Sequence, residues 1–202
     1  MFPLEGGNGI AEPDQKLNKT SMKQILTILL IAVLASSAGL AQDEVYFTWN
    51  AKLQLNGAFG EEAIHLETEE VSIKLDYETT EMILRFNMSS LNSNVDTVNQ
   101  MLRNKLSDVV FDGELSLDFI NTESHPPQDF TVEGWLILGT SKTRIKGKGE
   151  LYHINDAGEF ACMLGMTMHL NLEELKVGHP WPGLENEFEA IVTQAILKKN
   201  KK

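Results

Sequence analysis

Apolar and polar residues alternate with a period of two over most of the chain after residue 45. In segment 45–55, every odd-numbered residue from Val45 to Leu55 is apolar, and most residues between them are polar. Similar alternation recurs in seven further segments: 64–77, 82–88, 111–119, 130–138, 143–151, 160–170 and 188–197. Successive side chains of a β-strand point to opposite faces, so this pattern predicts half-buried strands. We expect about eight of them.

One stretch has a different period. From Asn94 onward the apolar residues recur every three or four positions: Val95, Val98, Met101, Leu102 and Leu106. This spacing places them on one face of a helix. Ser93 or Asn94 can cap its first turn, because both side chains accept hydrogen bonds from free backbone N–H groups. The pattern predicts one short helix near residues 94–106.

The predicted strands are separated by short turn signals such as Asn56-Gly57 and Gly139-Thr140-Ser141, which favour antiparallel connections. A β-sandwich and a closed up-and-down barrel both fit this order. Several predicted strands have ten or more residues, whereas strands in globular proteins usually have about five or six. Closure into a barrel also removes exposed sheet edges. We therefore predict an all-β fold, an eight-stranded antiparallel barrel with one short helix.

The interior of such a barrel is either filled or hollow. A barrel of about eight strands has room for its own side chains or for one small ligand. Gly134, Gly147, Gly149 and Gly165 fall inside predicted strands, where glycine marks either a bend or space left for another group. Six methionines lie in the predicted strands and helix: Met82, Met88, Met101, Met163, Met166 and Met168. Flexible thioethers suit ordinary core filling and also a cavity for long aliphatic chains.

The first 41 residues lack the alternating pattern. Residues 22–41 combine a short positive start, a ten-residue apolar run (25–34) and small residues, which is typical of a secretory signal peptide. The alternative is a membrane-spanning helix, but such a helix needs about twenty apolar residues and this run has only ten. We expect 1–21 to be a disordered, over-extended start preceding the true initiator Met22. Residues 42–202 then form a single barrel domain with a basic tail, and the protein is periplasmic or secreted.

Composition narrows the function further. The 202 residues include 17 Lys+Arg and 29 Asp+Glu, a net charge of −12, which disfavours nucleic-acid partners. The tail 198–202 is basic and is either solvated or in contact with a membrane surface. Cys162 is the single cysteine, which excludes an intramolecular disulfide. The five histidines lack metal-binding spacing, and no serine-nucleophile or phosphate-loop motif occurs. We expect no catalytic residue, metal or cofactor.

Three stretches resemble the YceI-like family of secreted bacterial proteins. The first runs from Ile73 to Leu91, and the second from Val98 to Phe111. The third and most specific, Phe130 to Lys142, is similar to a strand–turn–strand segment of the family that contains glycine and leucine. Residues 160–172 also resemble the penultimate strand of the family. The chain departs from the family at its first strand, where Trp49-Asn50-Ala51-Lys52 replaces the usual His-Ser pair.

This resemblance implies a lipocalin-like barrel that holds a polyisoprenoid or another long-chain amphiphile and has no enzymatic activity. Eight apolar residues of the alternating segments are the candidate ligand contacts: Leu84, Phe86, Met88, Phe119, Leu136, Leu164, Met166 and Met168. The alternative is a non-enzymatic envelope stress or interaction protein whose barrel is filled by its own side chains. The oligomeric state stays open.

Overall fold

The computed structural model describes residues 45–104, 107–120, 126–154, 160–176 and 183–199. The predictions of a disordered start over 1–21 and a signal peptide over 22–41 fall outside the described residues. So do residues 200–202, the end of the basic tail. Within the described ranges, the strands and the helix can be compared directly with the sequence pattern.

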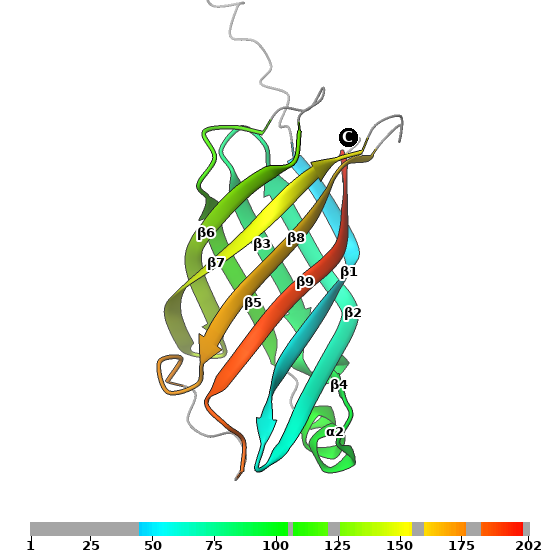
Figure 1. Cartoon of the computed structure of the whole chain (residues 1–202), viewed down its shortest axis with the longest axis vertical. Helices are drawn as coiled ribbons and strands as arrows, with labels where there is room; N and C mark the ends of the chain where they lie inside the picture. Colours follow the sequence, from blue (N-terminus) through cyan, green and yellow to red (C-terminus); the bar gives the residue numbers. More distant parts are fainter. Residues whose placement is uncertain (1–44, 105–106, 121–125, 155–159, 177–182, 200–202) are drawn as a thin grey trace, which may run out of the picture. The chain divides into compact units, whose positions relative to one another are not determined.

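Eight long strands form a closed antiparallel barrel, which confirms the predicted fold class (Figure 1). They are β1 (Val45–Phe59), β2 (Glu62–Asp76), β3 (Glu81–Asn87), β5 (Asp108–Leu115), β6 (Gln128–Leu138), β7 (Ser141–His153), β8 (Phe160–Asn171) and β9 (Glu187–Lys199). Each strand pairs with the next around the barrel. The sheet closes because β1 pairs with both β2 and β9, as at Leu55, which faces Leu66 on one side and Ala190 on the other.

The segment between β3 and β5 contains the predicted helix. A 3₁₀ turn, η1 (Met88–Ser90), leads into a two-residue strand, β4 (Asn92–Ser93), which pairs with β2. The helix α2 follows (Asp96–Arg103) and lies at the lower end of the barrel in Figure 1. Its buried residues, Val98 and Leu102, belong to the apolar spacing seen in the sequence. The helix is confirmed, although it is shorter than the predicted 94–106.

The predicted cap is wrong, because Val95 occupies the N-cap position and makes no side-chain capping bond. The Asn94 side chain joins this segment to β2 instead. Its Oδ1 accepts a hydrogen bond from the His65 backbone N–H at 2.8 Å, and its Nδ2 donates to the Ala63 carbonyl at 3.1 Å. Ser93 pairs with the Asn99 side chain through its backbone N–H and carbonyl groups. The Ser93 hydroxyl accepts a hydrogen bond from the Val95 backbone N–H at 3.1 Å, so it binds one residue before the helix, while Asn94 is engaged by β2.

One half of the barrel is filled with side chains. This is the half in which β1 begins and β9 ends, and it is the upper half in Figure 1. Tyr46 stacks on Tyr77 there with ring centroids 3.9 Å apart. Buried apolar residues from β3 and from β5 to β9 complete this half: Met82, Leu115, Phe130, Leu151, Leu164 and Leu197.

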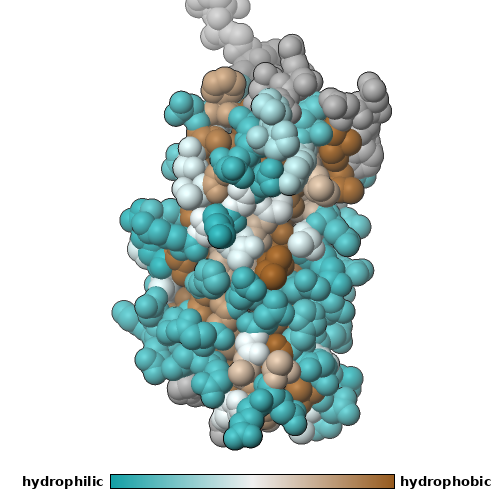
Figure 2. Space-filling view, in the orientation of Figure 1, coloured by the Kyte–Doolittle hydropathy of each residue, from teal (hydrophilic) through white to brown (hydrophobic). Residues whose placement is uncertain are grey.

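Two strand glycines leave space that the protein's own side chains occupy. A Cβ atom added at Gly147 would lie 2.6 Å from Met168 Cγ, and one at Gly149 would lie 2.9 Å from Phe130 Cε2. Both distances are far shorter than van der Waals contact between carbon atoms. At these positions the space beside glycine is therefore filled by methionine and phenylalanine. Outside the barrel, hydrophilic residues cover most of the face shown in Figure 2, with small hydrophobic patches between them.

Candidate functional site

The other half of the barrel encloses a cavity of about 460 Å³. All eight barrel strands contribute to its wall, from Leu53 and Leu55 on β1 round to Phe188 and Ala190 on β9. Met88 of η1, Leu102 of α2 and Leu184 also line the cavity, at the end of the barrel near α2. The volume lies within the range of about 300–1,000 Å³ found for small-molecule sites.

The wall is made almost wholly of apolar side chains. Leucine dominates, with phenylalanine, methionine, valine, isoleucine and alanine completing it. Among the described residues, four that line the cavity have polar side chains: Ser107, Thr140, Ser141 and Lys176. None of the four lies in the middle of a strand. Ser107 precedes β5, Thr140 lies in the turn between β6 and β7, Ser141 is the first residue of β7, and Lys176 follows β8. In the part of the chain that the structure describes, the cavity thus has an apolar body and polar groups only at the end of the barrel.

Hydrogen bonds fix the segment after β8 against the β6–β7 turn. The Ser141 hydroxyl donates to the Leu175 carbonyl, and the Thr143 hydroxyl donates to the Glu174 carbonyl at 3.3 Å. The Leu175 N–H donates in turn to the Asn171 carbonyl at 3.0 Å. Leu175 and Lys176 are consequently positioned over one edge of the cavity by backbone contacts.

Five of the eight candidate ligand contacts line the cavity: Leu84, Phe86, Met88, Leu136 and Met168. They come from β3, η1, β6 and β8, so the fold brings together side chains that lie far apart in the sequence. Leu164 and Met166 are buried in the filled half and do not line the cavity. Contact with a ligand stays a prediction for the five that do.

Phe119 is not an interior residue, and its placement by strand parity was wrong. Strand β5 ends at Leu115, so the alternation does not continue to residue 119. The chain turns, and the Ile120 N–H donates to the Tyr77 carbonyl at 2.9 Å, with Ile120 buried. The Phe119 side chain is 65% exposed as a result.

Sequence reasoning missed several lining residues. Leu53, Leu55 and Leu170 belong to alternating segments, so the pattern contained a signal for them. The loop residues Ser107, Thr140 and Lys176 had no such signal, because their place at the cavity depends on how strand ends meet.

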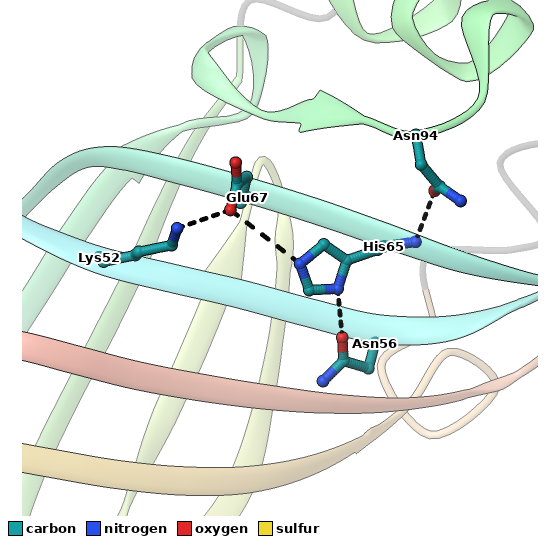
Figure 3. Close-up of polar contacts among 5 residues, drawn as sticks. All are labelled: Lys52, Asn56, His65, Glu67 and Asn94. Atoms are coloured by element: carbon teal, nitrogen blue, oxygen red, sulfur yellow. Dashed lines mark hydrogen bonds and ion pairs between the residues drawn. The ribbon is translucent and has the colours of Figure 1, made fainter.

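Titratable groups gather elsewhere, on the outer face of β1 and β2 (Figure 3). Lys52 Nζ lies 2.7 Å from Glu67 Oε2, and His65 Nε2 lies 4.0 Å from the same oxygen. His65 Nδ1 and Asn56 Oδ1 form a hydrogen bond of 2.5 Å. The hydrogen bond between Lys52 and Glu67 lowers the pKa of the carboxyl and raises the pKa of the amine. These side chains project away from the cavity and join the two strands on the solvent side.

Cys162 lies in the filled half of the barrel and is buried. Burial raises the pKa of its thiol, and a hydrogen bond with Tyr77 offsets part of that rise. A raised pKa reduces the thiolate fraction, which is the reactive form. The geometry therefore gives this thiol a packing role.

Across the described ranges, no group of three or more His, Cys, Asp or Glu side chains could hold a metal ion. Helix α2 is short, and the described part of the chain has no helix long and apolar enough to cross a membrane.

Comparison with known proteins bears on the fold. No protein-family model matches the sequence, and no curated protein sequence matches it. Among solved structures, the chain is similar to a polyisoprenoid binding domain from Saccharophagus degradans implicated in plant cell wall breakdown. The TM-score is 0.57 with 8% sequence identity, and the match covers 78% of this chain and 99% of that domain. At this identity, the similarity is one of fold.

Proposed function

We propose that this protein binds a long-chain apolar or amphiphilic molecule, lipid-like or isoprenoid-like, inside the barrel. It acts as a secreted or periplasmic binding protein and not as an enzyme. The observation that carries the proposal is the apolar cavity of about 460 Å³ enclosed by all eight strands. The fold shared with a polyisoprenoid binding domain supports the same class of ligand.

Burial of hydrocarbon is the driving force that this wall offers. Each methylene withdrawn from water contributes about 0.8 kcal/mol, so ten methylenes contribute about 8 kcal/mol before the costs of association. An affinity of about 1 μM corresponds to about 8 kcal/mol, so several further contacts are needed to reach it after those costs. Dispersion contacts with the apolar wall can supply them.

Filling the cavity tests the proposal directly. Leu136 lines the cavity on β6, whereas its neighbour Ile137 does not line it. Adjacent residues of a strand point to opposite faces, so Leu136→Trp puts an indole inside the barrel and Ile137→Trp puts one outside. Binding is measured with an environment-sensitive fluorescent fatty acid. We expect Leu136→Trp to weaken binding at least tenfold and Ile137→Trp to leave it unchanged.

Equal binding by the wild type and Leu136→Trp would rule out this cavity as the site. If neither the probe nor any molecule extracted from the natively purified protein binds, the ligand-free interaction protein becomes the better interpretation. The filled half of the barrel fits that alternative, whereas the cavity does not.

The proposed compartment has its own test. The complete chain is expressed in a bacterium with an outer membrane, and its mass is measured after cell fractionation. We expect the periplasmic protein to begin near Gln42, since small residues precede that position. Recovery of only the full-length chain from the cytoplasm would contradict the predicted export.

A further inference from the structure

The cavity ends inside the barrel at a floor to which Phe111 and Met168 contribute. Both side chains line the cavity and both are buried. Phe111 lies over Gly113, where an added Cβ would be 2.6 Å from Phe111 Cζ, and Met168 lies over Gly147 at the same distance from Cγ. Gly113 and Gly147 offer no side chain of their own, so these two side chains occupy the space beside them. Behind the floor, Phe130 and Met166 continue the filled core.

The depth from the open end to the floor follows from the strands. Lining residues run from Leu84 to Met88 beside β3 and from Ser107 to Phe111 beside β5, which is four residue steps in each case. Four steps of about 3.3 Å cover about 13 Å along a strand. A strand tilt of about 40° reduces this to about 10 Å along the barrel axis. The geometry of single bonds advances an extended chain by about 1.2 Å per bond, so about eight to eleven carbons fit.

At the open end of the cavity, the described residues place one positive charge. Lys176 is the single charged residue among the described residues that line the cavity, and Ser107 and Thr140 add hydroxyl groups. The acids of the same segment, Glu173 and Glu174, do not line it. The Glu173 carboxylate accepts a hydrogen bond of 2.8 Å from Asn186 Nδ2. A lysine beside hydroxyl donors favours an anionic group, since charge-assisted hydrogen bonds are the stronger ones.

We infer that the barrel selects single-chain amphiphiles with an anionic head group and buries about ten carbons of the chain. The head group lies at Lys176, and the chain ends against Phe111 and Met168. This inference rests on the proposed function and narrows it. A chain much longer than ten carbons leaves the excess outside the barrel and gains little from it.

A series of saturated fatty acids with 6 to 16 carbons tests the depth on the unmodified protein. Each acid displaces the fluorescent probe below its own aggregation concentration. We expect affinity to rise about fourfold per methylene, which corresponds to about 0.8 kcal/mol, up to about ten carbons. It then levels off. A steady rise through 16 carbons overturns the inference but leaves the proposed function standing. Failure of the probe and every acid to bind would instead refute the proposed function.

Removing part of the floor should increase the chain length at which affinity levels off. Met168 and Met166 lie two residues apart on β8 and are 4% and 3% exposed, but only Met168 lines the cavity. Met168→Ala removes about three atoms from the floor, so we expect the plateau to shift to chains two or three carbons longer. Met166→Ala removes the same atoms behind the floor and should leave the plateau in place. An unchanged plateau in folded Met168→Ala places the floor elsewhere and contradicts the inference.

The head group has a separate readout. We expect Lys176→Gln to weaken the binding of decanoic acid five- to tenfold. The binding of decanol, which has the same chain length and no charge, should be unchanged. Lys148→Gln makes the same charge change at an exposed position away from the cavity and should affect neither. Equal loss for the acid and the alcohol, or no loss for either, overturns the assignment of Lys176.

Discussion

Replacing Gly149 with alanine adds a methyl group where the barrel has no room for it. The new Cβ would lie 2.9 Å from Phe130 Cε2, and closer still to Phe130 Cζ and to the Gly165 carbonyl oxygen. The oxygen belongs to the backbone of β8, and the ring is buried in the filled half. Neither group can move without disturbing neighbouring strands.

Gly165 provides a matched control on the adjacent strand. A Cβ there meets only the Val192 carbonyl oxygen at 3.9 Å, which is ordinary contact. The two glycines occupy one strand pair, since Gly149 faces Met166 and Glu150 faces Gly165. The same substitution therefore tests two environments within one sheet.

The expected effects have opposite signs. Overpacking a core costs about 1–3 kcal/mol and sometimes more. Because the new methyl group meets both the Phe130 ring and the Gly165 carbonyl oxygen, we expect Gly149→Ala to lose about 3 kcal/mol of stability. Gly165→Ala should stabilise by about 0.4–1 kcal/mol, because alanine restricts the unfolded chain. At about 2–4 °C per kcal/mol, Tm should fall by about 6–12 °C in the first variant and rise by about 1–4 °C in the second.

Thermal unfolding followed by circular dichroism measures both shifts, and urea unfolding gives the free energies independently. An unchanged m-value would show that the effect is on stability and not on the compactness of the unfolded state. Equal shifts for the two variants, or a larger loss for Gly165→Ala, would refute the claim that Phe130 occupies the space beside Gly149.

Two further predictions concern titratable groups. Burial raises the pKa of Cys162, so we expect its thiol to react with a disulfide reagent at least about 100-fold more slowly in the native protein than in urea, and comparable rates would contradict its burial. The hydrogen bond with Lys52 lowers the pKa of Glu67 below its ordinary 4.5, so its stabilising effect is present above that value and is lost as the pH falls through the folded pKa. The Tm difference between the wild type and Glu67→Gln should shrink as the pH falls from 6 to 3. It should also shrink with added salt. A Tm difference that grows at pH 3 would contradict the lowered pKa of Glu67.

The strand pattern predicted the fold class because alternation is a local property of the backbone. Leu84, Phe86, Leu136 and Met168 each belong to an alternating segment, and each faces the cavity. The sequence predicted helix α2 for the same reason, from the spacing of Val98 and Leu102. These features need only neighbours within one element.

The pattern failed where a strand ended or where depth along the barrel mattered. Phe119 has the parity of Phe111, yet β5 stops before it. Leu164 and Met166 share a strand and a face with Met168, but the floor separates them from the cavity. A period of two separates the two faces of a strand, but it carries no information about how far along the barrel a cavity extends.

The order of apolar and polar residues was enough to predict long, half-buried strands and a preference for closure, but not which face of each strand points inward. Only the tertiary structure decided that one half of the interior is solid and the other hollow. The reason is volume: the rings of Phe111 and Phe130 and the Met168 side chain occupy space beside Gly113, Gly149 and Gly147. A large side chain lies beside a glycine only if the two residues, on different strands, come to the same level of the barrel. That strand register exists only after the sheet has closed.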